Sequence, residues 1–438
     1  MKSIYSAKKE PMRLACMLSG SGTNVRKIIE RQLKLGEGSP FRVVAIFTDN
    51  KNSNAVNIAA ENVIPFLCND IKDYYEKRNA DRKDLNVRRE YDAETKKFLC
   101  QHKADAVALC GYMSIVTAEI TDSFVTVNIH PADLRKKGKN GRRLYAGMLG
   151  VPSVQAAIMN GDSSLRSSVH LVTSGLDEGP ILVVSAPVKV KVSEEEKKNP
   201  MLLKEAAERN MEALKEKGDW AIYPEAIEML ARGKFGIEGT DIFVDGTRYD
   251  NGYCPSDEKE AIRQAMKEKR RRIPDVTEKS AAITKNLLAL SEFQAAKRVM
   301  FYCALPNEAQ TKEAIKEANA LGKKVLLPVT RQSQIIVRGF TGFENLKPGA
   351  YGILEPTSAD AVDEKIDLVF VPGLAFDKNG TRIGFGLGCY DEFLKLTNGK
   401  KAGLCFEEQL FDRLPRENKD VPMDIIITEQ RVINVEKG

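Results

Sequence analysis

The amino-acid sequence predicts an α/β protein with two domains. Its 438 residues exceed the size at which a single hydrophobic core stops growing. Short apolar segments of strand type alternate with helical segments, an order typical of parallel sheets covered by helices on both faces. The motifs that carry chemistry form two sets that do not interleave along the chain. We therefore expect one domain over residues 1–253 and a second over residues 254–438.

Composition and charge narrow the functional class. Hydrophobic residues make up 42% and charged residues 29%, which is ordinary for a globular protein. No apolar run reaches membrane-spanning length, and basic residues are not interleaved with aromatic ones, so neither a membrane nor a nucleic acid is expected as a partner. Eight scattered cysteines indicate reduced thiols and a cytoplasmic location. With three histidines and no metal-ligand spacing, a zinc site is not expected. The oligomeric state stays open.

The first predicted strand, Arg13–Leu18, runs into a glycine-rich loop. The loop, Ser19-Gly20-Ser21-Gly22-Thr23-Asn24, is followed by apolar residues at helical spacing. A strand, a glycine-rich turn and a helix N-terminus together make an anion cradle, because free backbone N–H groups and the helix dipole favour negative charge. A plain tight turn explains the loop equally well. Further strands are expected over Phe41–Thr48 and residues 104–109, with helices over residues 54–61 and 88–102.

The stretch that organises the first half is Val125–Pro131. Val125, Val127 and Ile129 alternate with polar residues, so Asn128 and His130 project to the same side of a strand. The proline ends the strand there. In an open parallel sheet, ligands bind at the carboxyl ends of the strands. Taken alone, the pair also fits a strand end whose polar side chains satisfy loop backbone groups.

The rest of the first half continues the α/β pattern. The basic segment 135–147 is expected to be a surface loop, followed by a helix over Val154–Met159. Two antiparallel strands are expected over Ser168–Val172 and Pro180–Val190, and a charged helical stretch over residues 194–217.

Five motifs of this half, taken in order, resemble the folate-dependent formyltransferases. Residues 12–253 are most similar to the glycinamide ribonucleotide formyltransferases of purine biosynthesis, which implies a Rossmann-like formyltransferase fold. The motifs are Ser19–Asn24, Leu109–Met113, Asn128–Pro131, Leu176–Pro180 and Asp219–Pro224.

The resemblance implies formyl transfer from 10-formyltetrahydrofolate to an amine. Asn128 and His130 would donate hydrogen bonds to the oxyanion of the tetrahedral intermediate, and Asp177 would orient the imidazole and relay a proton through water. A carboxylate beside His130 is expected to raise the pKa of the imidazole.

The resemblance also assigns the substrate contacts of this half. The folate pocket would be formed by Leu109 and Met113 together with residues 173–177. The residues implied for the acceptor and its phosphate are Gly22, Thr23, Asn24, Arg89 and Asp219.

Two departures from the family pattern concern specificity. Ser114 stands where the family has an arginine that meets the folate glutamate tail. Ala132-Asp133-Leu134 and the basic segment up to Gly147 replace a proline-rich loop beside the acceptor. The identity of the acceptor therefore stays open.

The second half carries a glycine-rich motif of its own. A basic helix contains Lys259, Arg263 and Arg270, and strands are expected over residues 299–305, 325–329, 335–337 and 368–371. Residues 382–391 place three alternate glycines before a helix that starts near Tyr390. Such glycines let backbone amides approach a polyphosphate, and a carboxylate in the turn suits Mg²⁺. A structural glycine-rich turn is the alternative.

Residues 257–430 closely resemble 5-formyltetrahydrofolate cyclo-ligases, also called methenyltetrahydrofolate synthetases. The resemblance implies a three-layer α/β cyclo-ligase fold and ATP-driven conversion of 5-formyltetrahydrofolate to 5,10-methenyltetrahydrofolate. Glu308 and Tyr390 would bind the folate, and Asp391 the Mg²⁺. The residues implied for ATP are Lys259, Arg263, Arg382, Gly384, Gly386 and Gly388.

Leu387, Cys389 and Glu392 depart from the usual cyclo-ligase motif. The sequence thus predicts a bifunctional one-carbon enzyme that acts on small molecules. One alternative keeps the cyclo-ligase but gives the first domain another amine, or water, as acceptor. A second alternative is a folate-binding regulatory protein in which one domain is inactive.

Overall fold

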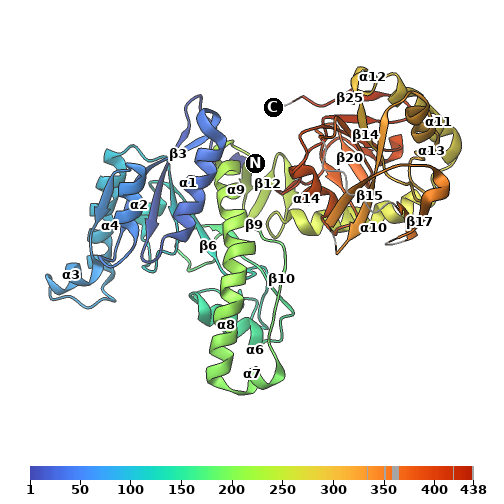
Figure 1. Cartoon of the computed structure of the whole chain (residues 1–438). Coiled ribbons are helices and arrows are strands. Elements are labelled where there is room, and N and C mark those ends of the chain that lie inside the picture. The colour runs from blue at the N-terminus through green and yellow to red at the C-terminus, as the bar shows by residue number, and fades with distance from the viewer. Residues whose placement is uncertain (333, 350–351, 358–364, 418, 437–438) are drawn as a thin grey trace. The chain divides into compact units, whose positions relative to one another are not determined.

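The computed structural model describes residues 1–332, 334–349, 352–357, 365–417 and 419–436. The chain divides into two compact units, Met1–Cys254 and Pro255–Gly438 (Figure 1). The junction has no separate linker. The Tyr253 amide donates to Leu182 O over 3.0 Å, Cys254 is buried in the first unit, and helix α10 (Pro255–Arg270) begins at the next residue.

The first unit is built on a seven-stranded sheet of order β4-β3-β2-β5-β6-β8-β9. Its first five strands are parallel to one another. Strand β8 pairs antiparallel with both β6 and β9. The predicted α/β class is confirmed. The strands are β2 (Met12–Leu18), β3 (Phe41–Thr48), β4 (Phe66–Cys68), β5 (Ala106–Leu109), β6 (Val125–His130), β8 (Ser168–Leu171) and β9 (Ile181–Val184).

Both faces of this sheet are covered by helices. In β2, Leu14 and Cys16 belong to the core under α1 (Thr23–Leu35) and α9 (Trp220–Ala231), whereas Ala15 and Met17 belong to the opposite core. Strands buried on both faces read as continuous apolar runs, which explains the sequence pattern. The other helices are α2 (Ala55–Asn62), α3 (Ile71–Glu76), α4 (Leu85–Gln101), α5 (Ala118–Thr121), α6 (Val151–Met159), α7 (Glu194–Lys198) and α8 (Pro200–Leu214).

Two predicted elements of the first unit are divided. The strand expected over residues 180–190 ends at Val184, and β10 (Val188–Lys189) pairs instead with β7 (Ser164–Leu165). The expected helix over residues 194–217 is split, because Asn199 caps the start of α8. A π-helical turn, Lys215–Asp219, then leads from α8 into α9 as one long column (Figure 1). A small sheet joins β1 (Lys2–Ser3), β11 (Phe235–Glu238), β12 (Asp241–Val244) and β13 (Thr247–Tyr249).

The second unit contains another seven-stranded sheet, of order β16-β15-β14-β19-β22-β24-β25. Its five inner strands are parallel, and both edge strands are antiparallel. Separate apolar cores lie on its two faces, which gives the predicted three layers. The strands are β14 (Arg298–Met300), β15 (Lys324–Arg331), β16 (Gln334–Gly339), β19 (Leu368–Val371), β22 (Lys400–Leu404), β24 (Ile425–Ile427) and β25 (Val432–Asn434).

Helices and smaller strands complete the second unit. The strand predicted over residues 299–305 is short and ends at Met300. The helices are α10, α11 (Val276–Leu288), α12 (Ser291–Ala295), α13 (Lys312–Ala320) and α14 (Cys389–Lys395), and the smaller strands are β17 (Leu346–Pro348), β18 (Leu354–Pro356), β20 (Ala375–Asp377), β21 (Arg382–Ile383) and β23 (Leu410–Phe411). Among the described residues, no helix is both long and apolar enough to cross a membrane.

Candidate active sites

The loop between β2 and α1 is shaped by Gly22. This residue has φ +70°, and a Cβ built on it would lie 2.8 Å from Leu18 Cδ1, so a larger residue is excluded. Thr23 and Asn24 open the 13-residue helix α1 with their backbone N–H groups at its N-terminus. The predicted arrangement of strand, glycine turn and helix N-terminus is therefore present, at the carboxyl end of a central parallel strand.

Asp219 lies beside the predicted cradle. The π-helical turn ends at Asp219 and places it in a buried position next to Asn24. Burial raises the pKa of its carboxyl group to about 6, and hydrogen bonds from Ser167 and Asn24 oppose the rise. The Ser167 hydroxyl donates to Asp219 Oδ1 over 2.5 Å. The buried Asn24 Oδ1 has no hydrogen-bond partner, so two oxygen acceptors, Asn24 Oδ1 and the Asp219 carboxylate, are available to an amine beside the anion cradle.

Strand β6 carries the predicted catalytic pair to the same edge of the sheet. Asn128 lies opposite His170 of β8, and its Nδ2 lies 3.2 Å from His170 Nε2. His130, the last residue of β6, is almost completely buried. Its Nε2 lies 3.0 Å from the carbonyl oxygen of Tyr145, and its Nδ1 lies 3.3 Å from Asp177 Oδ2. The structure thus brings the three predicted catalytic residues together.

Asp177 is the centre of this cluster. Its Oδ2 faces His130 and accepts a hydrogen bond of 2.8 Å from the Gly147 amide, and its Oδ1 lies 3.3 Å from His170 Nε2. Burial on its own would raise the pKa of this carboxyl group, but the two imidazoles and the Gly147 amide lower it to about 2. Asp177 therefore remains ionised at neutral pH. Its backbone has φ 53°, a strained conformation for a residue with a side chain.

Asp177 raises the pKa of His130, as expected, but it does not decide the net shift, which is downward. Burial lowers this pKa and outweighs the opposing effect of the carboxylate, and the neighbouring His170 and Arg143 lower it further. His130 is therefore neutral at neutral pH. Both of its ring nitrogens face acceptor oxygens, so only the protonated ring satisfies both contacts. This arrangement suits a histidine that takes up a proton during a reaction.

His170 is a member of the cluster that the sequence patterns did not reveal. Its Nδ1 lies 2.9 Å from Leu171 O, and because a carbonyl only accepts, Nδ1 carries the proton. Its Nε2 lies 3.2 Å from Asn128 Nδ2 and 3.3 Å from Asp177 Oδ1. His170 thereby orients the Asn128 amide and contacts Asp177 as well. The available signal was its place in a strand that pairs antiparallel with β6.

The basic segment is only partly the surface loop that was expected. Lys137, Lys139 and Arg142 are exposed. Arg143 is half-buried and donates to the backbone oxygen of Asp177 over 2.5 Å. The chain then turns inward, so that Tyr145 is buried against His130. The segment 143–147 therefore closes over the catalytic cluster.

The loop after β5 approaches the loop after β2. The Met113 amide donates to Ser19 Oγ over 2.8 Å, and Ser19 Oγ donates to the buried Asp49 over 2.6 Å. Ser114 also donates to Asp49. Of the two predicted folate contacts, Leu109 is buried and Met113 is exposed.

Arg89 is exposed on α4, away from the buried face of this helix. Its neighbour Arg88 points inward instead, where it forms an ion pair with Asp92 over 2.9 Å and donates to Tyr112 Oη over 3.1 Å. Two nitrogens of Arg88, Nε and Nη1, are buried without a partner. The inward-facing arginine of this motif is therefore Arg88.

The predicted ATP residues of the second unit surround the glycine-rich loop. Arg382 Nη2 lies 3.1 Å from Asp391 Oδ2, and its guanidinium lies over the Tyr390 ring, 5.6 Å from the ring centroid. Arg263 Nε donates to Gly384 O over 3.1 Å. Gly386 and Gly388 have φ of 105° and 73°, conformations that favour glycine. The loop leads directly into α14, as predicted.

Lys259 is not free in the structure. It is buried on α10 and forms ion pairs with Glu417, over 2.8 Å, and with Asp420. The amide of the next residue, Val421, donates to Asp391 Oδ1 over 3.4 Å. Lys259 thus holds Glu417 and Asp420 next to the residue whose amide contacts Asp391 of α14.

Asp391 is the predicted magnesium ligand. Within the described residues, no group of three or more His, Cys, Asp or Glu side chains is arranged to hold a metal ion. Mg²⁺ is usually held by one or two carboxylates together with substrate phosphates, so a single carboxylate beside a phosphate loop matches its preference. Asp391 occupies such a position, paired with Arg382.

The predicted folate residues of the second unit are Glu308 and Tyr390. Glu308 is buried, its Oε2 accepts from the Leu305 amide over 3.0 Å, and burial raises the pKa of its carboxyl group. Burial likewise raises the pKa of Tyr390, and the nearby Glu308 adds to the rise. The two side chains are therefore within electrostatic range of each other. Leu387 is 54% exposed in the glycine-rich loop, and Cys389 is the first residue of α14.

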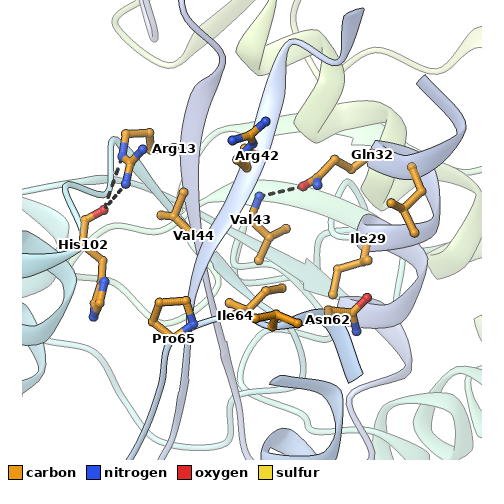
Figure 2. A pocket seen from close by; sticks show the side chains of 12 residues that line it. Arg13, Ile29, Gln32, Arg42, Val43, Val44, Asn62, Ile64, Pro65 and His102 are labelled. Atoms are coloured by element: carbon orange, nitrogen blue, oxygen red, sulfur yellow. Dashed lines mark hydrogen bonds between the residues drawn. The ribbon is translucent and has the colours of Figure 1, made fainter. Parts of the chain in front are cut away.

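A separate cavity of about 490 Å³ lies elsewhere in the first unit (Figure 2). Apolar side chains of α1 and of the turn after α2 line it, together with Arg42 and Gln32, whose side chain accepts a hydrogen bond from the Val43 amide over 2.7 Å. None of the predicted site residues lines this cavity.

Two family models match the chain, one in each unit. Residues 255–429 match the 5-formyltetrahydrofolate cyclo-ligase family, and residues 12–216 match the formyl transferase model. Both are families of enzymes.

Curated relatives match the second unit. A probable 5-formyltetrahydrofolate cyclo-ligase of Caenorhabditis elegans is 30% identical over 194 residues, which are 40% of this chain and 94% of that protein. The 5-formyltetrahydrofolate cyclo-ligase of Haemophilus influenzae is 32% identical over 33% of this chain and 83% of its own length.

Solved structures match each unit. Glycinamide ribonucleotide transformylase 1 of Symbiobacterium toebii is 26% identical with a TM-score of 0.42, over 54% of this chain and 95% of its own. The 5,10-methenyltetrahydrofolate synthetase of Aquifex aeolicus is 33% identical with a TM-score of 0.38, over 41% of this chain and 94% of its own.

Proposed function

Because the chain belongs to the 5-formyltetrahydrofolate cyclo-ligase family through its second unit and carries a formyl transferase domain in its first, we propose that it is a bifunctional enzyme of one-carbon metabolism. The first unit transfers a formyl group from 10-formyltetrahydrofolate to the amine of glycinamide ribonucleotide. The second unit converts 5-formyltetrahydrofolate to 5,10-methenyltetrahydrofolate with ATP. The observation that carries the first activity is the cluster in which Asp177 contacts His130 beside Asn128.

Formyl transfer needs hydrogen-bond donors where negative charge develops. When the acceptor amine attacks the formyl carbon, the formyl oxygen becomes an oxyanion, and donors fixed in advance lower the barrier. Asn128 Nδ2 and His130 Nε2 supply these donors, and in the structure they contact His170 Nε2 and Tyr145 O. The formyl oxygen replaces these contacts.

The proton of the attacking amine also needs an acceptor. His130 is neutral at rest because burial lowers its pKa, and since Nε2 carries the donated proton, the free nitrogen is Nδ1 beside Asp177. The amine proton reaches this nitrogen through water and the Asp177 carboxylate. The ionised Asp177 then stabilises the imidazolium over the 3.3 Å contact to Nδ1. Proton return to the departing tetrahydrofolate nitrogen restores the neutral ring.

The acceptor site combines an anion cradle with an amine-binding carboxylate. The backbone amides of Thr23 and Asn24 hold the phosphate, and Asp219, with a pKa of about 6, is ionised at neutral pH and accepts from the amine. A phosphate and a primary amine in one small molecule match glycinamide ribonucleotide. The exposed cations of the basic segment add a general attraction for phosphate.

In the second unit, the formyl oxygen of 5-formyltetrahydrofolate attacks the γ-phosphorus of ATP, and ADP leaves as the bond to the γ-phosphorus breaks. Nitrogen N10 then closes the ring on the activated carbon, and phosphate leaves. The backbone of Gly384, Gly386 and Gly388 cradles the phosphates, while Arg263 and Arg382 neutralise them. Asp391 would hold Mg²⁺, which would add positive charge beside the phosphates. Glu308 and Tyr390 orient the folate.

The two activities fit a common setting. The substrates are folates, ATP and a phosphorylated amine, and the proposed location is the cytoplasm. One hydrolytic ring opening converts the product of the second unit into the formyl donor of the first. Purine biosynthesis would consume the product of the first unit.

An acceptor screen tests the first activity. The full chain is supplied with 10-formyltetrahydrofolate and with glycinamide ribonucleotide, another phosphorylated amine, or no acceptor, and the release of tetrahydrofolate is measured. Release that depends on glycinamide ribonucleotide supports the proposal. Release without any acceptor identifies a hydrolase, and a preference for another amine replaces the proposed substrate. In a parallel assay, 5-formyltetrahydrofolate must yield 5,10-methenyltetrahydrofolate only when ATP is present.

A further inference from the structure

Arg270, the last residue of α10, is a buried cation at the centre of the second unit. Its side chain is 2% exposed. It donates to Asn307 twice, from Nη2 to Oδ1 over 2.7 Å and from Nε to the backbone oxygen over 3.1 Å. Nη1 also donates to Gly373 O over 3.4 Å. A guanidinium held by this many contacts has one orientation, and it keeps its charge because arginine does not lose its proton in proteins.

The same guanidinium faces the proposed folate residue Glu308. Arg270 Nη2 lies 3.5 Å from Glu308 Oε1, and the other carboxylate oxygen accepts from the Leu305 amide over 3.0 Å. Burial raises the pKa of Glu308, whereas the cation opposes this rise. Arg270 therefore favours the ionised form of a carboxylate that is 7% exposed.

Arg270 also contacts the proposed ATP loop. Its guanidinium lies over the ring of Phe385, with 5.4 Å between the guanidinium carbon and the ring centroid. Phe385 is situated between Gly384 and Gly386, so its side chain is a bulky anchor in an otherwise glycine-rich segment. Phe385 is 46% exposed, and its contact with the buried guanidinium ties one position of this glycine-rich segment to α10.

We propose that Arg270 is a positioning residue that couples the folate and ATP sites of the second unit, because one guanidinium holds both the Glu308 carboxylate and the Phe385 ring. The inference rests on the proposed cyclo-ligase activity and extends it to a residue to which we assign no contact with either substrate. Loss of Arg270 then weakens the binding of both substrates from a single position.

The chain offers matched controls beside Arg270. The side chains of Arg271 and Arg272 are 72% and 77% exposed, and both contact Glu268 of the same helix. Replacement of either arginine by glutamine removes the same charge from the same region of the chain without touching Glu308 or Phe385.

The test measures the Michaelis constants of the full chain for 5-formyltetrahydrofolate and for ATP, together with thermal unfolding. Arg270→Gln is expected to raise both KM values by about 10-fold or more, the scale for losing a buried hydrogen bond to a charged group. Arg270→Lys keeps the charge but lacks the planar fork. It is expected to recover most of the KM for folate and little of the KM for ATP. Arg271→Gln is expected to leave both values unchanged.

Two double variants separate the coupling from a general loss of structure. In a Glu308→Gln background, Arg270→Gln is expected to raise the KM for folate no further while still raising the KM for ATP. In a Phe385→Leu background, the pattern is expected to be reversed. Non-additive effects of this kind require the two contacts themselves.

Several results would overturn the inference. One is an Arg270→Gln variant that behaves like Arg271→Gln. Another is a variant that loses thermal stability and kcat while both KM values stay normal, which would assign Arg270 a purely structural role. If Arg270→Gln does not fold, Arg270→Lys provides the same comparison, and equal recovery of both KM values would refute the split between the two sites. Absence of ATP-dependent ring closure in the unaltered chain would instead refute the proposed function.

Discussion

The backbone carbonyl of Tyr145 lies 3.0 Å from Nε2 of His130, on the inner side of a segment that sequence patterns place at the surface. A carbonyl oxygen accepts but does not donate, so this contact requires a proton on Nε2. The Gly147 amide, two residues further, donates to Asp177. The segment 143–147 therefore holds the side chains of His130 and Asp177 in position, and in the proposed mechanism the formyl oxygen replaces its contact with His130.

The first prediction concerns this cluster. His130→Ala and Asp177→Asn are each expected to lower the kcat of formyl transfer by about 10²-fold or more, the scale for losing an acid–base or oxyanion group. The affinity for 10-formyltetrahydrofolate should change much less, because the oxyanion and the transferred proton exist only during the reaction. Steady-state kinetics and a folate-binding titration check both statements. His102→Ala, at the end of α4, is the control for replacing a histidine. Near-normal turnover in both site variants would refute the catalytic roles of His130 and Asp177.

The second prediction concerns the basic segment. Neutralising Lys136, Lys137, Lys139, Arg142 and Arg143 is expected to raise the KM of a phosphorylated acceptor in a salt-dependent manner, because exposed charges attract phosphate through screened electrostatics. Cyclo-ligase activity should be unchanged.

In the structure, these five cations fall into two groups that differ in their contacts and exposure. Lys136 and Arg143 contact Asp162 and Asp177, whereas the other three are exposed. A triple variant with glutamine at 137, 139 and 142 therefore isolates the phosphate effect from any change at the catalytic cluster. Lys198→Gln with Lys204→Gln, at exposed positions near α8, provides a control of similar charge loss. An unchanged acceptor KM in the triple variant would make the segment a solvated loop.

The third prediction is a pH dependence centred on Asp219. Its carboxyl group has a pKa of about 6 in the folded chain instead of 3.8, so the folded state holds its proton more tightly than the unfolded state. Stability from this group is present at low pH and is lost as the pH rises from about 4 to about 6, and the shift corresponds to about 3 kcal/mol. Asp219→Asn is therefore expected to gain several degrees in melting temperature relative to the unaltered chain at pH 7 and little at pH 4.

The same titration should appear in the kinetics. Below about pH 6 the protonated Asp219 can no longer bind an amine as a carboxylate, so the acceptor KM of the unaltered chain should rise on acidification. Asp219→Asn should have a high acceptor KM that lacks this step. A melting-temperature difference that is the same at both pH values would show that the buried carboxyl is not perturbed.

The fourth prediction concerns the independence of the two halves. A fragment ending at Cys254 is expected to keep formyl transfer, and a fragment starting at Pro255 is expected to keep ATP-dependent ring closure, because each half has its own apolar cores. In the full chain, Arg382→Ala should abolish ring closure and leave formyl transfer intact when 10-formyltetrahydrofolate is supplied directly. If formyl transfer is lost as well, the two activities share a site or an obligatory coupling.

The alternation of apolar and polar residues and the positions of glycines were sufficient to predict the backbone elements that carry the first site. The alternation in Val125–Ile129 predicted β6 and placed Asn128 and His130 on one side, and glycine positions predicted the turns before α1 and α14. These features are local, so a single stretch of chain determines them. The Asn128–His170 contact, in contrast, depends on the register between two antiparallel strands, which no local pattern specifies.

Charge patterns in the sequence were misleading about which charged side chains are buried and how burial shifts their pKa values. Arg143 and Arg270 belong to basic runs that are typical of solvated surfaces, yet the first is half-buried against Asp177 and the second is almost completely buried. The pKa of His130 is lowered although a carboxylate lies beside it, because desolvation outweighs that neighbour. Such balances depend on how much water the fold excludes, which is a property of the assembled tertiary structure.

The direct junction between Cys254 and Pro255 has a consequence for protease sensitivity. Proteases cut segments that can leave their hydrogen bonds and enter an active site in extended form. Tyr253 is held by the Leu182 and Val184 backbone, and Cys254 is buried. Residue 255 already begins a helix, and a peptide bond that precedes a proline is a poor cleavage site. Limited proteolysis of the native chain should therefore leave this junction intact and cut first at exposed positions within the units, such as the tip of the basic segment.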